Sequence, residues 1–285
     1  MTAYPNSDLN IDEELVQSLI DSQFPEFSEL SLKLVGSGWD NQNYKLGDQY
    51  LVRIPRRALG AELITYEIEW TQKLKGQLPL PIPAPIRVGK PDSSYPWHWS
   101  ILPWFEGTAA RNTFLAEPEL FRLVHFLKKL HDISPEGAPL NPFRDAPLTS
   151  KADVIDERIQ KNKLVLSPHV LKLWEEALAQ EINTNPTLIH GDLHPGNIIV
   201  KEGIIQAVID WGDITKGDPA TDLAILWMLP MTKTLREDLV EEYGATPSTI
   251  TRAKGWAVFF AVVFRTSGTE YEELGANIFS FLKSS

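Results

Sequence analysis

Two short polar segments in the second half of the chain carry residue types and spacings that could do chemistry. The first, HGDLHPGN, places Asp192 five positions before Asn197, and the second, IDWGD, places Asp210 thirteen positions after that amide. Carboxylate and amide oxygens are ligands that Mg²⁺ prefers, and magnesium neutralises the charge of a triphosphate. A further carboxylate can hold an acceptor hydroxyl and accept its proton. The pattern predicts phosphoryl transfer, with Asp192 as the catalytic residue and with Asn197 and Asp210 as metal ligands.

The residues between the two segments predict a β-hairpin. Apolar runs at 198–200 and 204–209 flank a turn at 201–203. A hairpin folds its own ends together, so the residue before its first strand and the residue after its second strand become neighbours. We therefore expect Asn197 and Asp210 to lie close to each other.

The same residues have plainer interpretations. HGDLHPGN could be a turn whose polar side chains only satisfy backbone donors, but two motifs, their spacing and the hairpin between them agree in favouring catalysis. His190 and His194 could bind zinc. However, a loop that contains Pro and Gly lacks the helical geometry in which two such histidines share a metal, and a third ligand is missing.

Composition limits the class of protein. The chain has 285 residues, 43% of them hydrophobic, which is enough core for one large domain or for two lobes. The lack of cysteine excludes disulfides and thiolate sites, and a net charge of −11 argues against a nucleic-acid partner. The acidic N-terminus does not resemble a signal peptide, and the longest apolar run covers only residues 256–264. We therefore expect a soluble cytoplasmic protein without a membrane partner.

Periodicity and turn residues predict an α+β fold in two parts. The first part contains an amphipathic helix at 12–23, capped by Asn10 or Asp12, and a second helix at 61–75. Its strands form an antiparallel meander and are expected at 30–36, 42–47, 49–55, 86–88 and 99–102. Prolines make 78–85 an extended connector. Beyond Gly107 the chain becomes mainly helical, with helices expected at 117–132, 151–163, 168–183, 219–229, 233–243, 248–267 and 270–283.

HGDLHPGN, together with IDWGD and GDPATDLA, resembles the aminoglycoside phosphotransferase family, which includes macrolide phosphotransferases and relatives of choline kinase. The likeness covers nearly the whole chain and implies a bilobal fold similar to that of protein kinases. It implies a β-rich nucleotide-binding lobe at 1–103, a hinge at 104–107, and a helical lobe with the catalytic loop and the substrate site at 108–285. Asp222 resembles an acid that braces the catalytic loop.

The resemblance also implies residues that bind the phosphate donor, ATP or GTP, together with Mg²⁺. Ser37 and Gly38 would belong to a loop that covers the phosphates. Arg53 stands where the family usually has a lysine and would bridge a phosphate and Glu67. This departure matters because a guanidinium binds in a rigid fork, whereas an ammonium acts as a compact charge. The purine edge would meet backbone groups of the hinge, namely those of Pro103 and Phe105.

The acceptor implied by the resemblance is a small hydroxylated compound, expected to be an aminoglycoside or macrolide antibiotic, as in antibiotic resistance. Carboxylates of the C-terminal part could contact it, namely Asp156, Glu157, Glu270 and Glu273. Two alternatives stay open: a kinase of a metabolite such as choline, another amino alcohol or a sugar, and a kinase-like protein that binds nucleotide without transfer. A protein kinase is disfavoured because Gly191 replaces the usual arginine and no A-P-E motif follows Asp210. The expected assembly is a monomer or a homodimer.

Overall fold

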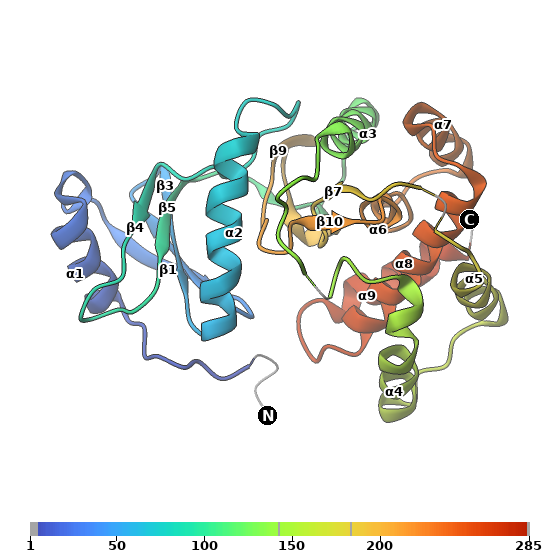
Figure 1. Cartoon of the computed structure of the whole chain (residues 1–285), viewed down its shortest axis with the longest axis horizontal. Coiled ribbons are helices and arrows are strands. Elements are labelled where there is room, and N and C mark those ends of the chain that lie inside the picture. The colour runs from blue at the N-terminus through green and yellow to red at the C-terminus, as the bar shows by residue number, and fades with distance from the viewer. Residues whose placement is uncertain (1–4, 142, 183, 284–285) are drawn as a thin grey trace. The chain divides into compact units, whose positions relative to one another are not determined.

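The computed structural model describes residues 5–141, 143–182 and 184–283. These residues form two compact units, whose elements are labelled in Figure 1. The first, here called the sheet unit, comprises the residues up to Gln77 together with Pro81–Glu106 and Ile209–Gly212. The second, the helical unit, comprises Leu78–Leu80, Gly107–Val208 and the residues from Asp213 onward. The expected division into a nucleotide-binding lobe, a hinge and a substrate lobe stays a prediction.

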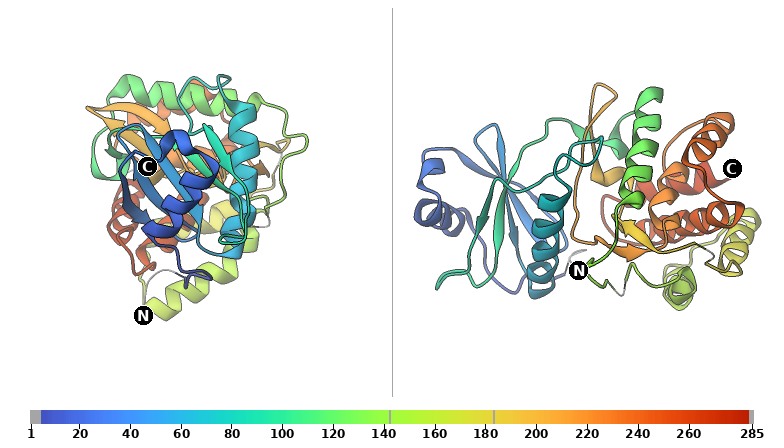
Figure 2. Two further views of the ribbon diagram at one scale, coloured as in Figure 1. Left: turned by 90° about the vertical axis from the view of Figure 1, so that its left-hand side faces the viewer. Right: turned by 45° about the horizontal axis from the view of Figure 1, so that its top comes forward.

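The sheet unit is built on a five-stranded antiparallel sheet with the strand order β1-β2-β3-β5-β4. Its strands are β1 Leu32–Ser37, β2 Asn41–Leu46, β3 Tyr50–Pro55, β4 Arg87–Gly89 and β5 Trp99–Pro103. The strands lie between helix α1 (Glu13–Gln23) and helix α2 (Ala58–Leu74) in the views of Figures 1 and 2, and a 3₁₀ turn, η1 (Pro25–Phe27), follows α1. The predicted antiparallel sheet is confirmed.

Local signals explain why α1 begins where it does. Asp12 is its N-cap, and its Oδ1 accepts the N–H of Leu15 at 2.9 Å, which satisfies a donor that has no partner within the helix. Val16 and Ile20 lie on one face of the helix and are fully buried in a core cluster that includes Tyr44 of β2. The helix and the sheet therefore share one hydrophobic core.

The helical unit contains two small sheets among its helices. Strands β6 (Thr108–Ala109), β8 (Ile198–Lys201) and β9 (Ile204–Val208) form one, and β7 (Thr187–Ile189) pairs with β10 (Thr215–Gly217) in the other. The longer helices are α3 Glu117–Asp132, α4 Ala152–Asn162, α5 Pro168–Leu178, α7 Lys233–Tyr243, α8 Pro247–Arg265 and α9 Glu272–Leu282. Shorter helical segments are η2 Ala110–Asn112, η3 Leu148–Lys151, η4 Pro195–Asn197, α6 Ala220–Leu223 and η5 Ala224–Trp227.

Strands β8 and β9 form the predicted hairpin. Lys201 pairs with Ile204, so the loop contains only Glu202 and Gly203. Both loop residues have positive φ, 52° and 80°, as in the type I′ turn whose twist matches that of the strands. The hairpin is therefore confirmed, whereas the expected closeness of the residues that flank it stays a prediction.

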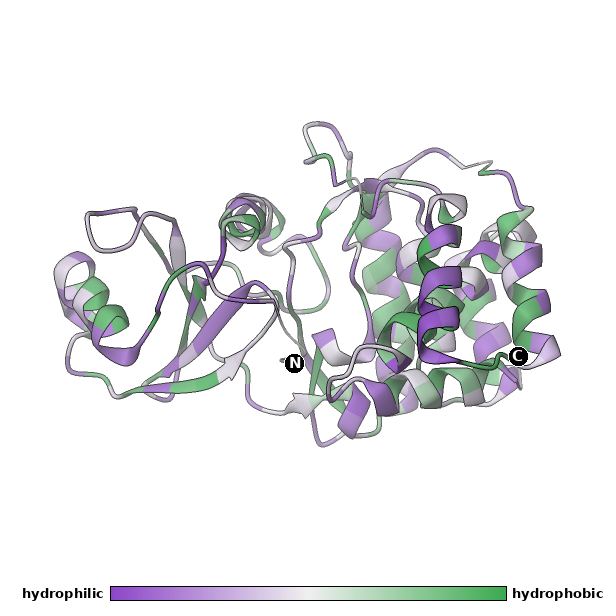
Figure 3. Ribbon diagram, turned by 90° about the horizontal axis from the view of Figure 1, so that it is seen from below, coloured by the Kyte–Doolittle hydropathy of each residue, from purple (hydrophilic) through white to green (hydrophobic). Residues whose placement is uncertain are grey.

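Helix α8 is central to the core of the helical unit. Residues 255–262 are buried, and the hydrophobic stretches of this region can be followed in Figure 3. A Cβ atom on Gly255 would lie 2.3 Å from the Cβ of Ala177 on α5, and one on Gly275 of α9 would lie 2.4 Å from the backbone nitrogen of Arg265. These two glycines allow α5 and α9 to approach α8 closely. Within the described residues, we find no helix long and apolar enough to cross a membrane.

Several predicted elements are wrong in extent. The helix expected at 219–229 is the single turn α6 followed by η5, and the helix expected at 168–183 ends at Leu178, with residue 183 outside the described residues. Residues 220–229 are all buried, so they show no periodic exposed face that could separate a helix from shorter turns. Strands β6, β7 and β10 have no predicted counterpart because two or three residues are too few to show alternation.

Candidate active site

The loop at 190–197, which joins β7 to β8, is held by one buried carboxylate. Asp222 accepts the N–H of His190 at 2.7 Å through Oδ2 and the N–H of Gly191 at 3.0 Å through Oδ1. Nε2 of His131, on α3, lies 3.2 Å from the same Oδ2. Asp222 is fully buried, where a charge is tolerated only with such partners. The conformation of the loop is therefore coupled to the helical core.

Gly191 has a backbone conformation that favours glycine. Its φ is 82°, and a Cβ atom there would lie 2.5 Å from the carbonyl oxygen of Asp213. Only a residue without a side chain lets the loop pack this closely against the segment that contains Asp213. Gly191 thereby sets the direction in which the next residue, Asp192, leaves the loop.

The carboxylate of Asp192 has partners at both oxygens. Oδ1 lies 2.5 Å from Nη2 of Arg144, and Oδ2 lies 3.3 Å from Nδ2 of Asn197 and 3.5 Å from Nε2 of His194. Asn197 also donates to the backbone oxygen of Asp192 at 2.9 Å. Burial opposes ionisation of Asp192, but the charge of Arg144 and the hydrogen bond from His194 outweigh it and lower the pKa of this carboxyl below its usual value. Asp192 is thus an ionised hydrogen-bond acceptor held beside Asn197.

Arg144 is a site residue that sequence reasoning missed. It belongs to the segment between α3 and η3, 48 positions before Asp192, and no motif surrounds it. Its Nη2 also lies 3.3 Å from Oδ2 of Asp213, whose Oδ1 accepts the side-chain amide of Asn141 at 2.6 Å. The two carboxylates raise the pKa of Arg144 against the opposing effect of burial. No local signal could have found it, because its partners are distant in sequence.

Aromatic rings gather around His194. The ring centroid of His194 lies 4.9 Å from that of Phe264 on α8, 5.5 Å from that of Tyr271 before α9, and 6.3 Å from that of Phe260. Nδ1 of His194 accepts the N–H of Gly196 at 3.0 Å, so Nε2 carries the proton that can face Asp192. The loop at 190–197 therefore packs against an aromatic cluster formed by Phe260, Phe264 and Tyr271.

The sheet unit contains a second charged group. Nε of Arg53 on β3 lies 2.9 Å from Oε2 of Glu67 on α2, and Nη2 of Arg53 contacts Oδ1 of Asp210. The side chains of Arg53 and Glu67 are 10% and 3% exposed, whereas that of Asp210 is 45% exposed. Burial lowers the pKa of Arg53, but its two carboxylate partners outweigh that effect and raise it. Burial also raises the pKa of Glu67, against the charge of Arg53. Asp210 has a positive φ of 66°, so its backbone adopts a left-handed conformation uncommon outside glycine.

Ser37 is the last residue of β1, and Gly38 follows it in the turn to β2. The N–H of Gly38 donates to the carbonyl of Asn41 at 2.8 Å and closes the turn. Arg56 donates to the hydroxyl of Ser37 at 3.0 Å and to the carbonyl of Gly38 at 3.2 Å, and Nε of Arg57 lies 2.5 Å from Oδ1 of Asp40. The turn is thus tied to the end of β3, and a role of its residues at phosphates stays a prediction.

The predicted hinge lies at the end of β5. Pro103 is the last residue of that strand and pairs with Tyr50, and the N–H of the next residue, Trp104, donates to the carbonyl of Gln49 at 2.8 Å. Phe105, which follows, is half-buried. The backbone of this segment is therefore anchored to the sheet, which suits a nucleotide-binding edge without testing that role.

The four carboxylates expected to contact an acceptor are all exposed. Asp156 and Glu157 lie on α4, and among the described residues neither forms an ion pair. Glu270 lies 3.8 Å from Nη2 of Arg111, and Glu273 is in the first turn of α9. The segment before α9 reaches the catalytic loop through Tyr271, so Glu270 is the one of the four whose chain neighbour contacts that loop.

Asn197 and Asp210 each have an oxygen that suits magnesium. Within the described part of the chain, no three or more His, Cys, Asp or Glu side chains form a metal site. Asn197 directs its amide nitrogen to Asp192, so its amide oxygen is the atom left for a cation. Asp210 is half-exposed and offers a carboxylate. Each residue supplies one hard oxygen, as expected where phosphate and water provide the remaining ligands.

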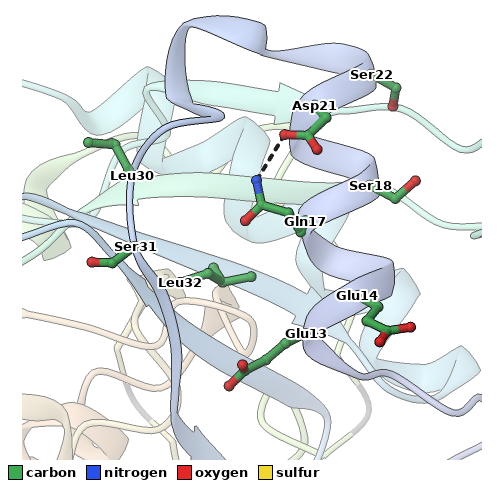
Figure 4. Close-up of a pocket in the computed structure, with 9 residues that line it drawn as sticks. All are labelled: Glu13, Glu14, Gln17, Ser18, Asp21, Ser22, Leu30, Ser31 and Leu32. Carbon is green, nitrogen blue, oxygen red and sulfur yellow. Dashed lines mark hydrogen bonds between the residues drawn. The ribbon is translucent and has the colours of Figure 1, made fainter.

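An open groove of about 910 Å³ lies elsewhere in the sheet unit, between α1 and the segment that enters β1. Figure 4 shows its lining, which includes the carboxylates of Glu13, Glu14 and Asp21. Gln17 donates to Asp21 at 2.8 Å across one turn of the helix. None of the residues expected at the active site lines this groove, so the groove adds nothing to that site.

An antiparallel sheet followed by a helical part, in which the loop at 190–197 precedes a hairpin, has the kinase-like fold of small-molecule phosphotransferases. Residues 31–257 match the family described as "Phosphotransferase enzyme family". The chain belongs to that family and is a phosphotransferase of the aminoglycoside phosphotransferase-like class, whose acceptor is an alcohol group.

Solved structures show the same fold. The GDP complex of aminoglycoside 2'-phosphotransferase-IIIa is 18% identical, with a TM-score of 0.72 over 96% of this chain and 99% of that one. The macrolide 2'-phosphotransferase MphH from Brachybacterium faecium is also 18% identical, with a TM-score of 0.63 over 92% of this chain and 98% of that one. A curated relative, the uncharacterized protein YcbJ of Bacillus subtilis (strain 168), is 31% identical over 86 residues, which are 29% of this chain and about a quarter (26%) of that protein.

Proposed function

We propose that this protein transfers the γ-phosphate of ATP or GTP to a hydroxyl group of an aminoglycoside or macrolide antibiotic. The observation that carries the proposal is the ionised carboxylate of Asp192, held beside Asn197 in a loop braced by Asp222. The family supports phosphate transfer, and relatives of the same fold have been solved with GDP, with ADP and with aminoglycosides.

In the proposed mechanism, Asp192 orients the acceptor. Its carboxylate accepts the hydrogen bond of the acceptor hydroxyl and takes up the proton as the oxygen attacks the γ-phosphorus, while the bond from that phosphorus to the oxygen of the β-phosphate breaks and ADP or GDP leaves. Because the pKa of Asp192 is low, the residue is a weak base, and its main contribution is to hold the hydroxyl in line. This suits a loose transition state, in which little proton transfer is needed before the phosphoryl group moves.

The nucleotide would be bound by residues of the sheet unit. Arg53 would hold a phosphate while Glu67 fixes its guanidinium, and the turn that contains Ser37 and Gly38 would cover the phosphates. Asn197 and Asp210 would hold Mg²⁺, which supplies charge neutralisation when it is bound. Asn197 and Asp210 flank the hairpin β8–β9 in the sequence, and this is the reason for proposing that both serve one ion.

The proposal is tested by incubating the purified protein, Mg²⁺ and each nucleotide with a pool of macrolides, aminoglycosides, amino alcohols and sugars. Mass spectrometry should show one acceptor that gains a phosphate, and the gain should disappear in Asp192→Ala. Asp238→Asn, which alters an exposed carboxylate on α7, should leave it intact and serves as the control. Phosphorylation of choline or a sugar alone would favour the metabolite kinase instead.

A second candidate is a protein that binds nucleotide without transfer. It is favoured by the contact between Arg53 and Asp210, because a guanidinium on this carboxylate competes with a metal ion. Tight binding of ATP or GTP by calorimetry, with no ADP or GDP release in the presence of the whole acceptor pool, would establish it.

A further inference from the structure

We propose that Arg144 is a positioning residue for Asp192: its guanidinium, anchored on Asp213, holds the Asp192 carboxylate in the orientation that receives the acceptor hydroxyl. This inference rests on the proposed function, because Asp192 is the group proposed to hold that hydroxyl. It assigns a role to the segment between α3 and η3, which none of the motifs predicts.

The geometry is that of a bridge between two carboxylates. Nη2 of Arg144 lies 2.5 Å from Oδ1 of Asp192 and 3.3 Å from Oδ2 of Asp213. Asp213 is itself held at Oδ1 by the amide of Asn141 at 2.6 Å. A chain of contacts therefore runs from Asn141 through Asp213 and Arg144 to Asp192, and every member belongs to the helical unit.

The side chain of Arg144 is held in place as well as charged. It is only 15% exposed, and its guanidinium carbon lies 5.4 Å from the ring centroid of Phe260 on α8. A guanidinium that faces an aromatic ring and two carboxylates loses its freedom to rotate. The guanidinium can therefore fix the orientation of the Asp192 carboxylate.

The contact from Arg144 is the shortest that the Asp192 carboxylate makes among the described residues. The contacts at its other oxygen, to Asn197 and His194, are 3.3 Å and 3.5 Å long. Short charge-assisted hydrogen bonds are roughly twice as strong as neutral ones, so the arginine dominates the orientation. Without it, the carboxylates of Asp192 and Asp213 would face each other with no cation between them and would repel.

The test compares the steady-state kinetics of Arg144→Gln, Arg144→Lys, Asp213→Asn and the double variant Arg144→Gln/Asp213→Asn with those of the wild type. We expect Arg144→Gln to lower kcat by roughly 30-fold or more, while KM for the nucleotide changes by no more than about twofold, because only orientation of the acceptor is lost. Arg144→Lys should restore part of kcat. The double variant should be faster than Arg144→Gln alone, since it removes the repelling charge.

Arg122→Gln is the matched control. Arg122 also pairs with a carboxylate, that of Glu119 at 2.8 Å, but on the partly exposed side of α3. We expect its kcat to stay within about twofold of the wild type, because Glu119 keeps the N–H of Ile205 as a partner and, among the described residues, neither member of the pair contacts Asp192. A kcat of Arg144→Gln close to that of this control, or a double variant slower than Arg144→Gln, would overturn the proposal. If Arg144→Gln does not fold, an unchanged kcat in Arg144→Lys and Asp213→Asn overturns it equally.

Crystal structures of the wild type and Arg144→Gln supply a readout that does not depend on turnover. The proposal predicts that the Asp192 side chain turns away from Asn197 when Arg144 is replaced. An Asp192 carboxylate with the same orientation in both structures would overturn it. This separates the two ideas: a wild type that phosphorylates nothing defeats the proposed function, while the orientation of Asp192 still decides the role of Arg144.

Discussion

Nε2 of His131 lies 3.2 Å from Oδ2 of Asp222, so helix α3 contacts the carboxylate that accepts the N–H groups of His190 and Gly191 in the loop at 190–197. The other ring nitrogen of His131 lies 2.7 Å from the hydroxyl of Tyr243, at the end of α7. If the hydroxyl donates to Nδ1, Nε2 carries the proton that faces Asp222. The loop that carries Asp192 is thereby tied to two helices that are remote from it in the sequence.

Asp222→Asn should impair both folding and activity. An asparagine has only one acceptor oxygen and cannot accept the N–H groups of both His190 and Gly191 as well as the contact from His131. We expect a loss of about 2–4 kcal/mol in the free energy of unfolding, measured by urea denaturation, because a buried donor is left unpaired and a charged network is broken. Thr221→Ser, beside it in the same buried turn, should cost less, and equal losses would contradict this account.

Arg53→Met should destabilise the sheet unit through the charge that it leaves behind. Glu67 is 2% exposed, so removal of Arg53 leaves a buried carboxylate without its cation. The expected cost is about 3 kcal/mol in the free energy of unfolding. Adding Glu67→Gln should recover part of it, since the buried charge is then gone. A double variant no more stable than Arg53→Met would show that the pair is not coupled.

Gly255→Ala should loosen the packing of α5 on α8. The added methyl would meet the Cβ of Ala177 at 2.3 Å and Cδ2 of Leu148 at 2.5 Å, so the helices must separate. Overpacking of this kind costs about 1–3 kcal/mol, measurable as a lower thermal midpoint. Gly36→Ala is the matched control, because a Cβ there meets nothing within 4 Å. Equal midpoints for the two variants would refute the close approach.

Tyr44→Phe should reduce the loss of stability at high pH. Burial, with the nearby charges of Glu13 and Asp12, raises the pKa of Tyr44 to about 12, from a usual value near 10. Between these two pH values the unfolded chain releases the phenolic proton and the folded chain keeps it, so the stabilisation present below pH 10 is lost as the pH rises to 12. Between these pH values, ionisation of this one group lowers the free energy of unfolding by about 1.4 kcal/mol per pH unit.

The measurement is urea unfolding at several pH values between 9 and 11.5 for the wild type and Tyr44→Phe. The variant should lose less stability over this range, although Tyr95, whose pKa burial also raises, continues to contribute. Tyr50→Phe, which alters a half-buried tyrosine of β3, is the control and should follow the wild type. Parallel curves for wild type and Tyr44→Phe would show that the Tyr44 phenol ionises equally in both states.

Local patterns predicted those elements whose signals lie within a few residues. The cap at Asp12, the hairpin around Glu202 and Gly203, and helices α3 and α7 follow from caps, turn residues and an exposed polar face. The pairing of Asp192 with Asn197 was also within reach, because the two residues lie five positions apart in one loop. These features depend on residues that are close in sequence, so they can be predicted without knowledge of the fold.

The tertiary structure alone decided which distant groups meet. Arg144 reaches Asp192 across 48 positions, His131 reaches Asp222 across 91, and the segment at 220–229 breaks into short turns because packing surrounds it on all sides. A single guanidinium or imidazole has no periodicity to reveal its partner. The sequence by itself thus determined the catalytic motif and the fold class, and packing determined the charges that hold the motif in place, because long-range contacts are set by how buried surfaces fit together.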